Sequence, residues 1–165
     1  YYRLGFPNEE VEDGVVQCLM EEYAVATSGE IDEDLQHLGS LISMGDINGF
    51  MTQIQQIMSQ IPFESNEAKL IEANFRNMLY LMIRSTGHKV LVEYPVLGGR
   101  IDVFFQTEQF AYVIECKRDQ SAAEALAQID EKKYADKLSV QNKKIVKIGV
   151  NFSTEERNLT EWKEG

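Results

Sequence analysis

Apolar residues recur every three or four positions through most of the first 85 residues, which is the spacing of helices that bury one face. Asn8 is placed to cap the first such segment, and Asn66 is placed to cap the last, which Gly87 ends. We therefore predict helices over residues 8–23, 32–44, 46–60 and 66–85.

The period changes after Gly87 to the alternation of extended strands. Turn residues at 97–99 and 107–109 separate three such runs, so they predict a meander. A stretch rich in Ala, Leu, Glu and Lys follows and predicts a further helix before a last strand. The expected strands cover 89–96, 100–106, 110–117 and 144–151, with the helix at 121–138. The tail after residue 151 gives no clear period, but Trp162 is expected to pack back onto the domain.

Pro62 and the polar residues 64–66 interrupt the helical pattern, and we place a domain boundary there. Residues 1–65 then form an acidic helical subdomain, and residues 66–165 form an α/β domain. The first part holds one basic residue and 12 acidic ones, whereas the second holds 15 of each, so all of the net charge of −11 lies in the first. The acidic part is expected to be a solvated surface or a docking surface.

Composition sets few limits on function. An apolar content of 44% fits a globular protein, and no apolar run approaches the roughly 20 residues of a membrane span. Cys18 and Cys116 lie in different expected elements without metal-site spacing, which favours a reducing cytoplasm. The chain begins without Met, so we interpret it as part of a longer polypeptide.

Three charged residues stand near the ends of expected strands: Asp102 on one, and Glu115 and Lys117 on the next. Uncompensated charges are costly in a core, so this pattern needs a reason. Joining the apolar sides of the two strands requires residue 103 to pair with 112 or 114. That register places Asp102 beside Glu115 or Val113, on the face that carries Lys117.

Two carboxylates beside an ammonium group suit a hard divalent cation and an attacking water. Asp102 and Glu115 could bind Mg²⁺ or Mn²⁺, together with the backbone carbonyl of Cys116, whose side chain should point into the core. Lys117 could then orient or deprotonate the water. The simpler reading of Glu-x-Lys on a strand is a same-face ion pair, and Asp102 at a compatible register weighs against it.

These residues resemble the PD-(D/E)XK nuclease superfamily, in particular its bacterial branch found C-terminal to an AAA-ATPase-like domain. The segments that carry the resemblance are Gly99-Arg100-Ile101-Asp102, Tyr112-Val113-Ile114-Glu115-Cys116-Lys117, Ala125-Leu126-Ala127-Gln128-Ile129, and Ile148-Gly149-Val150-Asn151-Phe152-Ser153. The opening Leu4-Gly5-Phe6-Pro7-Asn8 resembles the junction after the ATPase domain. Cys116 departs from the family pattern, in which Phe is more typical.

The resemblance implies a restriction-endonuclease-like fold with a mixed sheet flanked by helices. It implies that Asp102, Glu115 and Lys117 are the signature residues and that Glu72 is the first acid, with Glu67 and Glu93 as alternatives. It further implies an accessory motif on the later helix, formed by Gln128 and Lys132, with Tyr134 offset from them.

Two functions follow from these observations. The first is a Mg²⁺- or Mn²⁺-dependent nuclease acting on DNA or RNA, in a larger polypeptide with an upstream AAA-ATPase-like domain. The second is a catalytically inactive interaction or regulatory module with the same fold. The absence of a basic stripe in the sequence counts against the first.

Overall fold

The computed structural model describes residues 8, 10, 11, 14, 15, 28–60, 68–138, 140 and 142–165. Most of the helix expected over residues 8–23 lies outside this part, although the Val11 N–H does donate to Asn8 Oδ1 (2.9 Å) as expected for a cap. The predicted cap Asn66 also lies outside it. No helix within the described part is long and apolar enough to cross a membrane.

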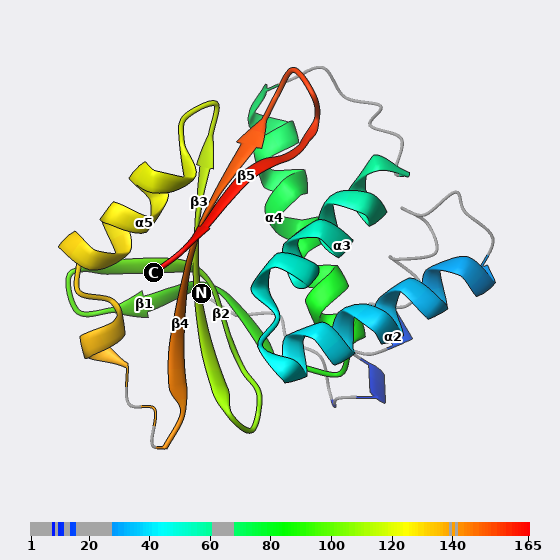
Figure 1. Cartoon of the computed structure of the whole chain (residues 1–165), viewed down its shortest axis with the longest axis horizontal. Helices are drawn as coiled ribbons and strands as arrows, with labels where there is room; N and C mark the ends of the chain where they lie inside the picture. The colour runs from blue at the N-terminus through cyan, green and yellow to red at the C-terminus, as the bar shows by residue number, and fades with distance from the viewer. Residues whose placement is uncertain are drawn as a thin grey trace.

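One five-stranded sheet organises the chain in the order β1-β2-β3-β4-β5 (Figure 1). Its strands are β1 Val90–Val96, β2 Gly99–Gln106, β3 Phe110–Arg118, β4 Lys144–Ser153 and β5 Asn158–Glu164. The first three form the predicted antiparallel meander, and β4 lies parallel to β3 after a helical crossover. The mixed α/β architecture expected from the sequence is therefore confirmed.

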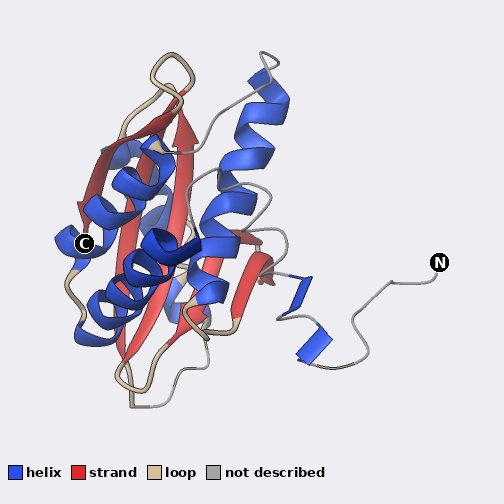
Figure 2. Cartoon of the chain, turned by 90° about the vertical axis from the view of Figure 1, so that its right-hand side faces the viewer, coloured by secondary structure: helices blue, strands red, loops and turns tan. Residues whose placement is uncertain are grey.

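Helices cover both faces of this sheet (Figures 1 and 2). On one face lie α2 Ser28–Met44, α3 Ile47–Ser59 and α4 Ala68–Ser85, and on the other lies α5 Ala122–Glu131. The larger core joins α2, α3 and α4 to one side of the strands, including Phe105 and Tyr112. The smaller core packs α5 against the opposite side, including Phe104 and Val113. The helices α2 and α3 thus share one core with the sheet. The domain boundary expected at residue 65 stays a prediction.

The α3 helix shows how the sequence pattern becomes packing. Asp46 caps it by accepting a hydrogen bond from the Gly49 N–H (2.9 Å). The predicted apolar stripe of Phe50, Ile54 and Ile57 is buried at 0 to 3% exposure. Burying such a stripe provides most of the stability of a short helix.

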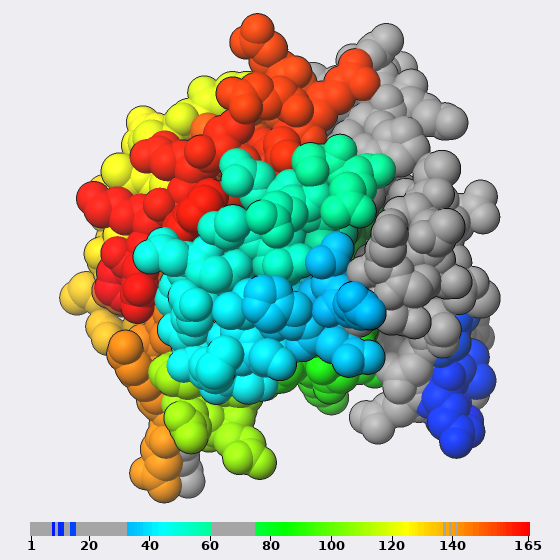
Figure 3. Space-filling model, turned by 45° about the vertical axis from the view of Figure 1, so that its right-hand side comes forward, coloured from blue at the N-terminus to red at the C-terminus, as the bar shows by residue number. Residues whose placement is uncertain are grey.

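The fifth strand has no counterpart in the sequence prediction. Along β5 only Leu159 is buried, so the alternation that marks a strand is too weak to detect. Gln55 of α3 holds the start of β5 by donating to the Leu159 carbonyl (2.7 Å) and accepting from Asn158 Nδ2 (3.1 Å). Trp162 packs against the larger core as expected, and Figure 3 shows α3 and β5 sharing one continuous surface.

The helix predicted over residues 121–138 is wrong at its C-terminal end, because α5 ends at Glu131. Lys133 adopts a left-handed conformation (φ 52°), and a short 3₁₀ turn at Ala135–Lys137 follows. This bend lets Tyr134 bury its ring in the smaller core at 2% exposure. Burial of an aromatic side chain thus overrides a favourable helix propensity.

Gly149 sets the distance between α5 and the sheet. A Cβ at this position would stand 2.2 Å from the Ala122 carbonyl oxygen and 2.5 Å from the Leu126 nitrogen. The helix start is fixed by a capping box of Ser121 and Glu124, and by Glu161 of β5, which accepts from the Ala122 N–H (3.0 Å).

We expect Gly149→Ala to lower the free energy of unfolding by about 2 kcal/mol or more, because the added methyl group meets backbone atoms that cannot move independently. Urea unfolding measures the change. Gly14→Ala is the matched control, since no atom of the described residues lies within 4 Å of a Cβ at that position. Equal stability of the two variants would contradict the close helix approach.

Candidate functional site

The strands β2 and β3 separate at one end of their shared ladder. They pair from Val103 with Ile114 to Gln106 with Ala111. Beyond Val103, β2 continues only with β1, whereas β3 continues beside β4. In Figure 1 the β1–β2 hairpin turns away from β3 at this position. We call this separation the fork. The pairing of 103 with 114 confirms one of the two registers expected from the sequence.

Asp102 lies on the β2 side of the fork. Its Oδ2 accepts a hydrogen bond from the Cys116 N–H (2.9 Å), so a side chain replaces the ladder bond that the separated strand no longer offers. Burial raises the pKa of Asp102, while the Cys116 N–H and the charges of Arg76 and Lys117 partly oppose the rise.

Strand alternation fails beside Asp102. It predicts Ile101 on the face of Val103 and Phe105, but Ile101 packs in the smaller core with Phe104 and Val113. The pairing of β1 with β2 skips Glu93 and Asp102, and Glu93 has a left-handed backbone (φ 51°). A local twist at the fork therefore changes which face Ile101 occupies.

Glu115 lies on the β3 side of the fork and is 3% exposed. Its Oε1 accepts from Gln128 Nε2, and its Oε2 is buried without a hydrogen-bond partner among the described residues. Burial, followed by the nearby carboxyl of Asp102, raises the pKa of Glu115 to about 8. Lys117, the Asp102 N–H and Arg76 partly oppose this rise, but none of them forms a hydrogen bond to Oε2, so this buried oxygen is suited to bind a cation.

Gln128 of α5 connects Glu115 and Lys117 of β3. Its Oε1 accepts from Lys117 Nζ, while its Nε2 donates to Glu115. An ammonium group only donates and a carboxylate only accepts, so an amide is the side chain that can bridge them without conflict. Gln128 was predicted from the resemblance, and the structure brings it together with Glu115 and Lys117.

A cavity of about 210 Å³ opens at the fork, and we call it the fork cavity. This volume would hold several water molecules at about 30 Å³ each. Its lining combines the expected charged residues with two arginines and two aromatic rings: Phe75, Arg76, Asp102, Glu115, Cys116, Lys117, Arg118 and Phe152. The side chain of Cys116 packs against the larger core, as predicted.

The remaining predicted residues lie elsewhere or outside the described part. Lys132 is exposed at the end of α5, and Tyr134 packs at the turn between β1 and β2, so neither lines the fork cavity. Glu93 pairs with Arg76 and Arg100. The backbone of Glu72 belongs to α4 one turn before Arg76, but its side chain is outside the described part, as is all of Glu67.

Arg76 and Arg118 were missed by the sequence reasoning. Arg118 follows Lys117 at the end of β3, where the end of the apolar run marks it only as a surface residue. Arg76 is four residues after Glu72, a spacing that places both positions on one side of α4. This spacing in the sequence could have indicated that Arg76 lies on the same side of the helix as the expected first acid.

Two carboxylates, those of Asp102 and Glu115, line the fork cavity among the described residues. Among the side chains that the structure describes, no group of three or more His, Cys, Asp and Glu residues could hold a metal ion. Mg²⁺ usually binds through one or two carboxylates and keeps several waters, so a pair of carboxylates with a backbone oxygen still fits such an ion.

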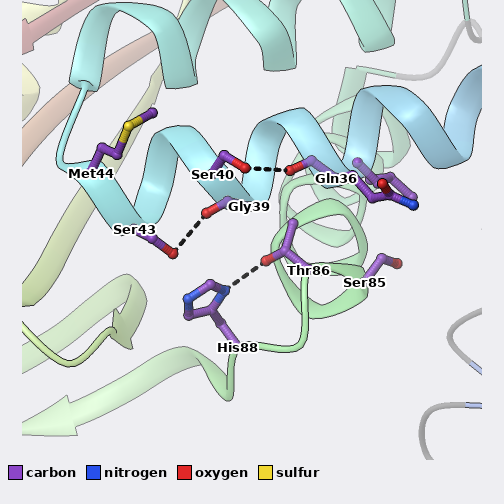
Figure 4. A pocket seen from close by; sticks show the side chains of 9 residues that line it. Gln36, Gly39, Ser40, Ser43, Met44, Ser85, Thr86 and His88 are labelled. Carbon is purple, nitrogen blue, oxygen red and sulfur yellow. Dashed lines mark hydrogen bonds between the residues drawn. The ribbon is translucent and has the colours of Figure 1, made fainter.

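A larger cavity, of about 940 Å³, lies between α2 and the end of α4 (Figure 4). Ser40 and Ser43 donate to carbonyls of their own helix, and the Thr86 hydroxyl hydrogen-bonds His88 Nδ1 (2.7 Å). Its lining residues, all within the described ranges, include no carboxylate. This cavity therefore lacks the groups that would bind a hard cation, and the fork cavity remains the candidate site.

Comparison with known proteins identifies the same region. A sequence model of the PD-(D/E)XK nuclease superfamily matches residues 70–162, which include all of β1 to β4 and α5. The chain is also similar to a protein of Azotobacter chroococcum mcd 1 described as "Uncharacterized protein in vnfD 5'region", with 28% identity over 163 residues. The alignment covers 96% of this chain and 31% of that relative, so the chain spans about a third of its length. No solved structure matches the chain.

We expect Glu115→Gln to weaken the pH dependence of stability in the presence of EDTA. The folded chain keeps the Glu115 proton up to about pH 8, whereas the unfolded chain releases it near the ordinary pKa of 4.5. The free energy of unfolding should therefore fall as pH rises through this window, and the variant should lose that part of the slope.

Urea unfolding at about pH 5 and about pH 8 measures this slope. Glu155→Gln, on an exposed residue of the β4–β5 turn, is the control and should keep the wild-type slope. If Glu115→Gln keeps it too, Glu115 is not a buried acid with a raised pKa.

Proposed function

The chain belongs to the PD-(D/E)XK nuclease superfamily, and from this premise we propose that it is a metal-dependent phosphodiesterase that hydrolyses DNA or RNA. One observation carries the proposal: Asp102, Glu115 and Lys117 line one cavity, in which a carboxylate oxygen of Glu115 is buried without a hydrogen-bond partner among the described residues. Structural ion pairs alone do not explain that oxygen.

The proposed cation is Mg²⁺ or Mn²⁺, because all of the available donors are hard oxygens. Asp102 and Glu115 would hold it with the backbone carbonyl of Cys116. The N–H and C=O of one strand residue point to the same side, and the Cys116 N–H already points across the fork to Asp102. When bound, the cation would polarise the phosphoryl group and make a water easier to deprotonate.

The residues of the chain divide the remaining work. Lys117 would orient the attacking water or accept its proton, in the position that Gln128 fixes. Glu72 would supply the first acid, because its position is on the side of α4 that carries Arg76. Lys132, one turn after Gln128, would contact the nucleic acid from the end of α5.

We further propose that the domain acts within a larger polypeptide that carries an upstream AAA-ATPase-like domain. The resemblance of Leu4-Gly5-Phe6-Pro7-Asn8 to the junction after such a domain supports this arrangement. That the chain spans about a third of its relative is compatible with it. We propose a reducing cytoplasm as its location, because Cys18 and Cys116 lie far apart in the sequence and lack metal-site spacing.

We expect Asp102→Ala and Glu115→Ala to lose Mn²⁺ binding in titration calorimetry, because each removes one of two ionised oxygen ligands. Wild-type affinity should increase toward pH 8, since binding requires the ionised form of Glu115 and releases its proton. Lys117→Ala should keep Mn²⁺ binding but slow the cleavage of DNA or RNA about 10²- to 10⁴-fold.

Lys163→Ala, which removes an exposed ammonium group of β5, is the control and should change neither property. Mn²⁺ binding without cleavage of single-stranded DNA, duplex DNA or RNA would favour the inactive regulatory module. An affinity for Mn²⁺ that survives both carboxylate substitutions would exclude the proposed metal site.

We expect Gln128→Ala to reduce the cleavage rate about 10- to 100-fold, because Lys117 and Glu115 lose the amide that orients both. Single-turnover cleavage measures the effect, with thermal unfolding to confirm that α5 still packs. Ala127→Ser, on the exposed neighbouring position of the same helix, should cleave at the wild-type rate. A wild-type rate for Gln128→Ala would show that the bridge has no part in the reaction.

A further inference from the structure

Two arginines share one carboxylate beside the fork cavity. Glu93 of β1 pairs with Arg76 of α4 and, at 2.7 Å, with Arg100 of β2. Arg76 also lines the fork cavity, and Arg100 lies two residues from Asp102. This network joins α4 to the β1–β2 hairpin beside the proposed active site.

The backbone of Glu93 indicates that this arrangement has a cost. Glu93 has a φ of 51°, in the left-handed region that residues with a Cβ adopt rarely. It lies inside an edge strand, where an extended conformation would be the ordinary outcome. Strained residues of this kind are retained where the surrounding structure, or a function, requires them.

The hairpin that carries Arg100 is held from its other side. A Cβ at Gly99 would stand 2.7 Å from the hydroxyl oxygen of Tyr134, so the hairpin lies directly against that buried ring. Leu97 at the turn is 85% exposed and the Arg100 side chain is 68% exposed. The hairpin therefore presents Arg100 to solvent from a position fixed on both sides.

The surroundings of the fork differ in charge from the chain as a whole. Among the side chains that the structure describes, the fork cavity and the network contain four basic groups, Arg76, Arg100, Lys117 and Arg118, and three carboxyl groups. The chain as a whole has a net charge of −11. Three guanidinium groups gathered in an otherwise acidic chain suit an anion, and a polyphosphate in particular.

We propose that Arg76 and Arg100 bind phosphodiester groups of the substrate strand and that Glu93 is the positioning residue for both. A guanidinium has five N–H donors, so each arginine can keep its pair with Glu93 and still donate to a phosphate. The substrate strand would then pass from the fork cavity along the β1–β2 hairpin. This inference rests on the proposed nuclease function and adds the path of its substrate.

Fluorescence anisotropy with labelled single-stranded DNA, duplex DNA and RNA tests the contacts in the presence of Ca²⁺. Arg76→Ala and Arg100→Ala should each weaken binding about tenfold. Each should also reduce the slope of log affinity against log salt concentration by about one. Arg100→Lys should restore part of the affinity, because it keeps the charge and loses the two-pronged contact. Lys163→Ala, at the opposite edge of the sheet, should bind as the wild type does.

The Glu93→Gln variant tests whether Glu93 positions the two arginines or only contributes a negative charge. It removes a negative charge, so binding should persist or tighten, whereas kcat should fall because both arginines lose their anchor. A purely structural role would instead lower thermal stability and leave kcat unchanged. That result for Glu93→Gln would exclude the positioning role.

The outcomes also separate this inference from the function on which it rests. If the wild type binds and cleaves nucleic acid and both arginine variants do the same, the proposed contacts are wrong and the nuclease function stands. If the wild type binds no nucleic acid, both proposals fail together. Arg100 is largely exposed, so its variant should fold and decide the question even if Arg76→Ala does not.

Discussion

The separation of β2 from β3 is the constraint on which the site depends. Two paired strands satisfy each other's backbone groups, and separated strands leave those groups to find other partners. Here Asp102 supplies a carboxylate oxygen to the Cys116 N–H of the opposite strand. A charged residue is thereby held inside the sheet, facing Glu115 across a cavity rather than across a ladder. Without the separation, both carboxyl groups would be ordinary neighbours on a sheet face.

Electrostatics makes this arrangement unfavourable for the chain alone. Burial raises the pKa of both Asp102 and Glu115, and a nearby carboxyl group adds to each rise, Glu93 for Asp102 and Asp102 for Glu115. Lys117 and Arg76 oppose the rise without abolishing it. A divalent cation would remove the conflict, because it favours the ionised form of both groups. The same features that destabilise the site are therefore those that suit it to metal binding, as is common where function and stability compete.

The opposite face of the sheet supplies the remaining part of the site. Gly149 allows α5 to approach β4 closely, and Glu161 of β5 fixes the start of that helix. Gln128 then reaches both Glu115 and Lys117. The last strand, which has only a weak sequence pattern, thus helps to place an amide at the centre of the site. Stability elements and site residues are coupled through α5, so they cannot be assigned to separate parts of the molecule.

The sequence by itself determined α2, α3, α4 and β1 to β4, the meander with its crossover, and the two registers that could bring Asp102 to the face of Glu115 and Lys117. It did so because helical period, strand alternation and turn residues are local, and because burial of apolar faces left only two registers open. Tertiary structure alone decided where α5 ends, that Leu159 and Trp162 belong to a strand, and which side Ile101 occupies. It also decided that Arg76 and Arg118 border the cavity. These features arise from contacts between segments far apart in the chain, such as Tyr134 with Gly99 and Gln55 with Leu159, and no local pattern encodes such contacts.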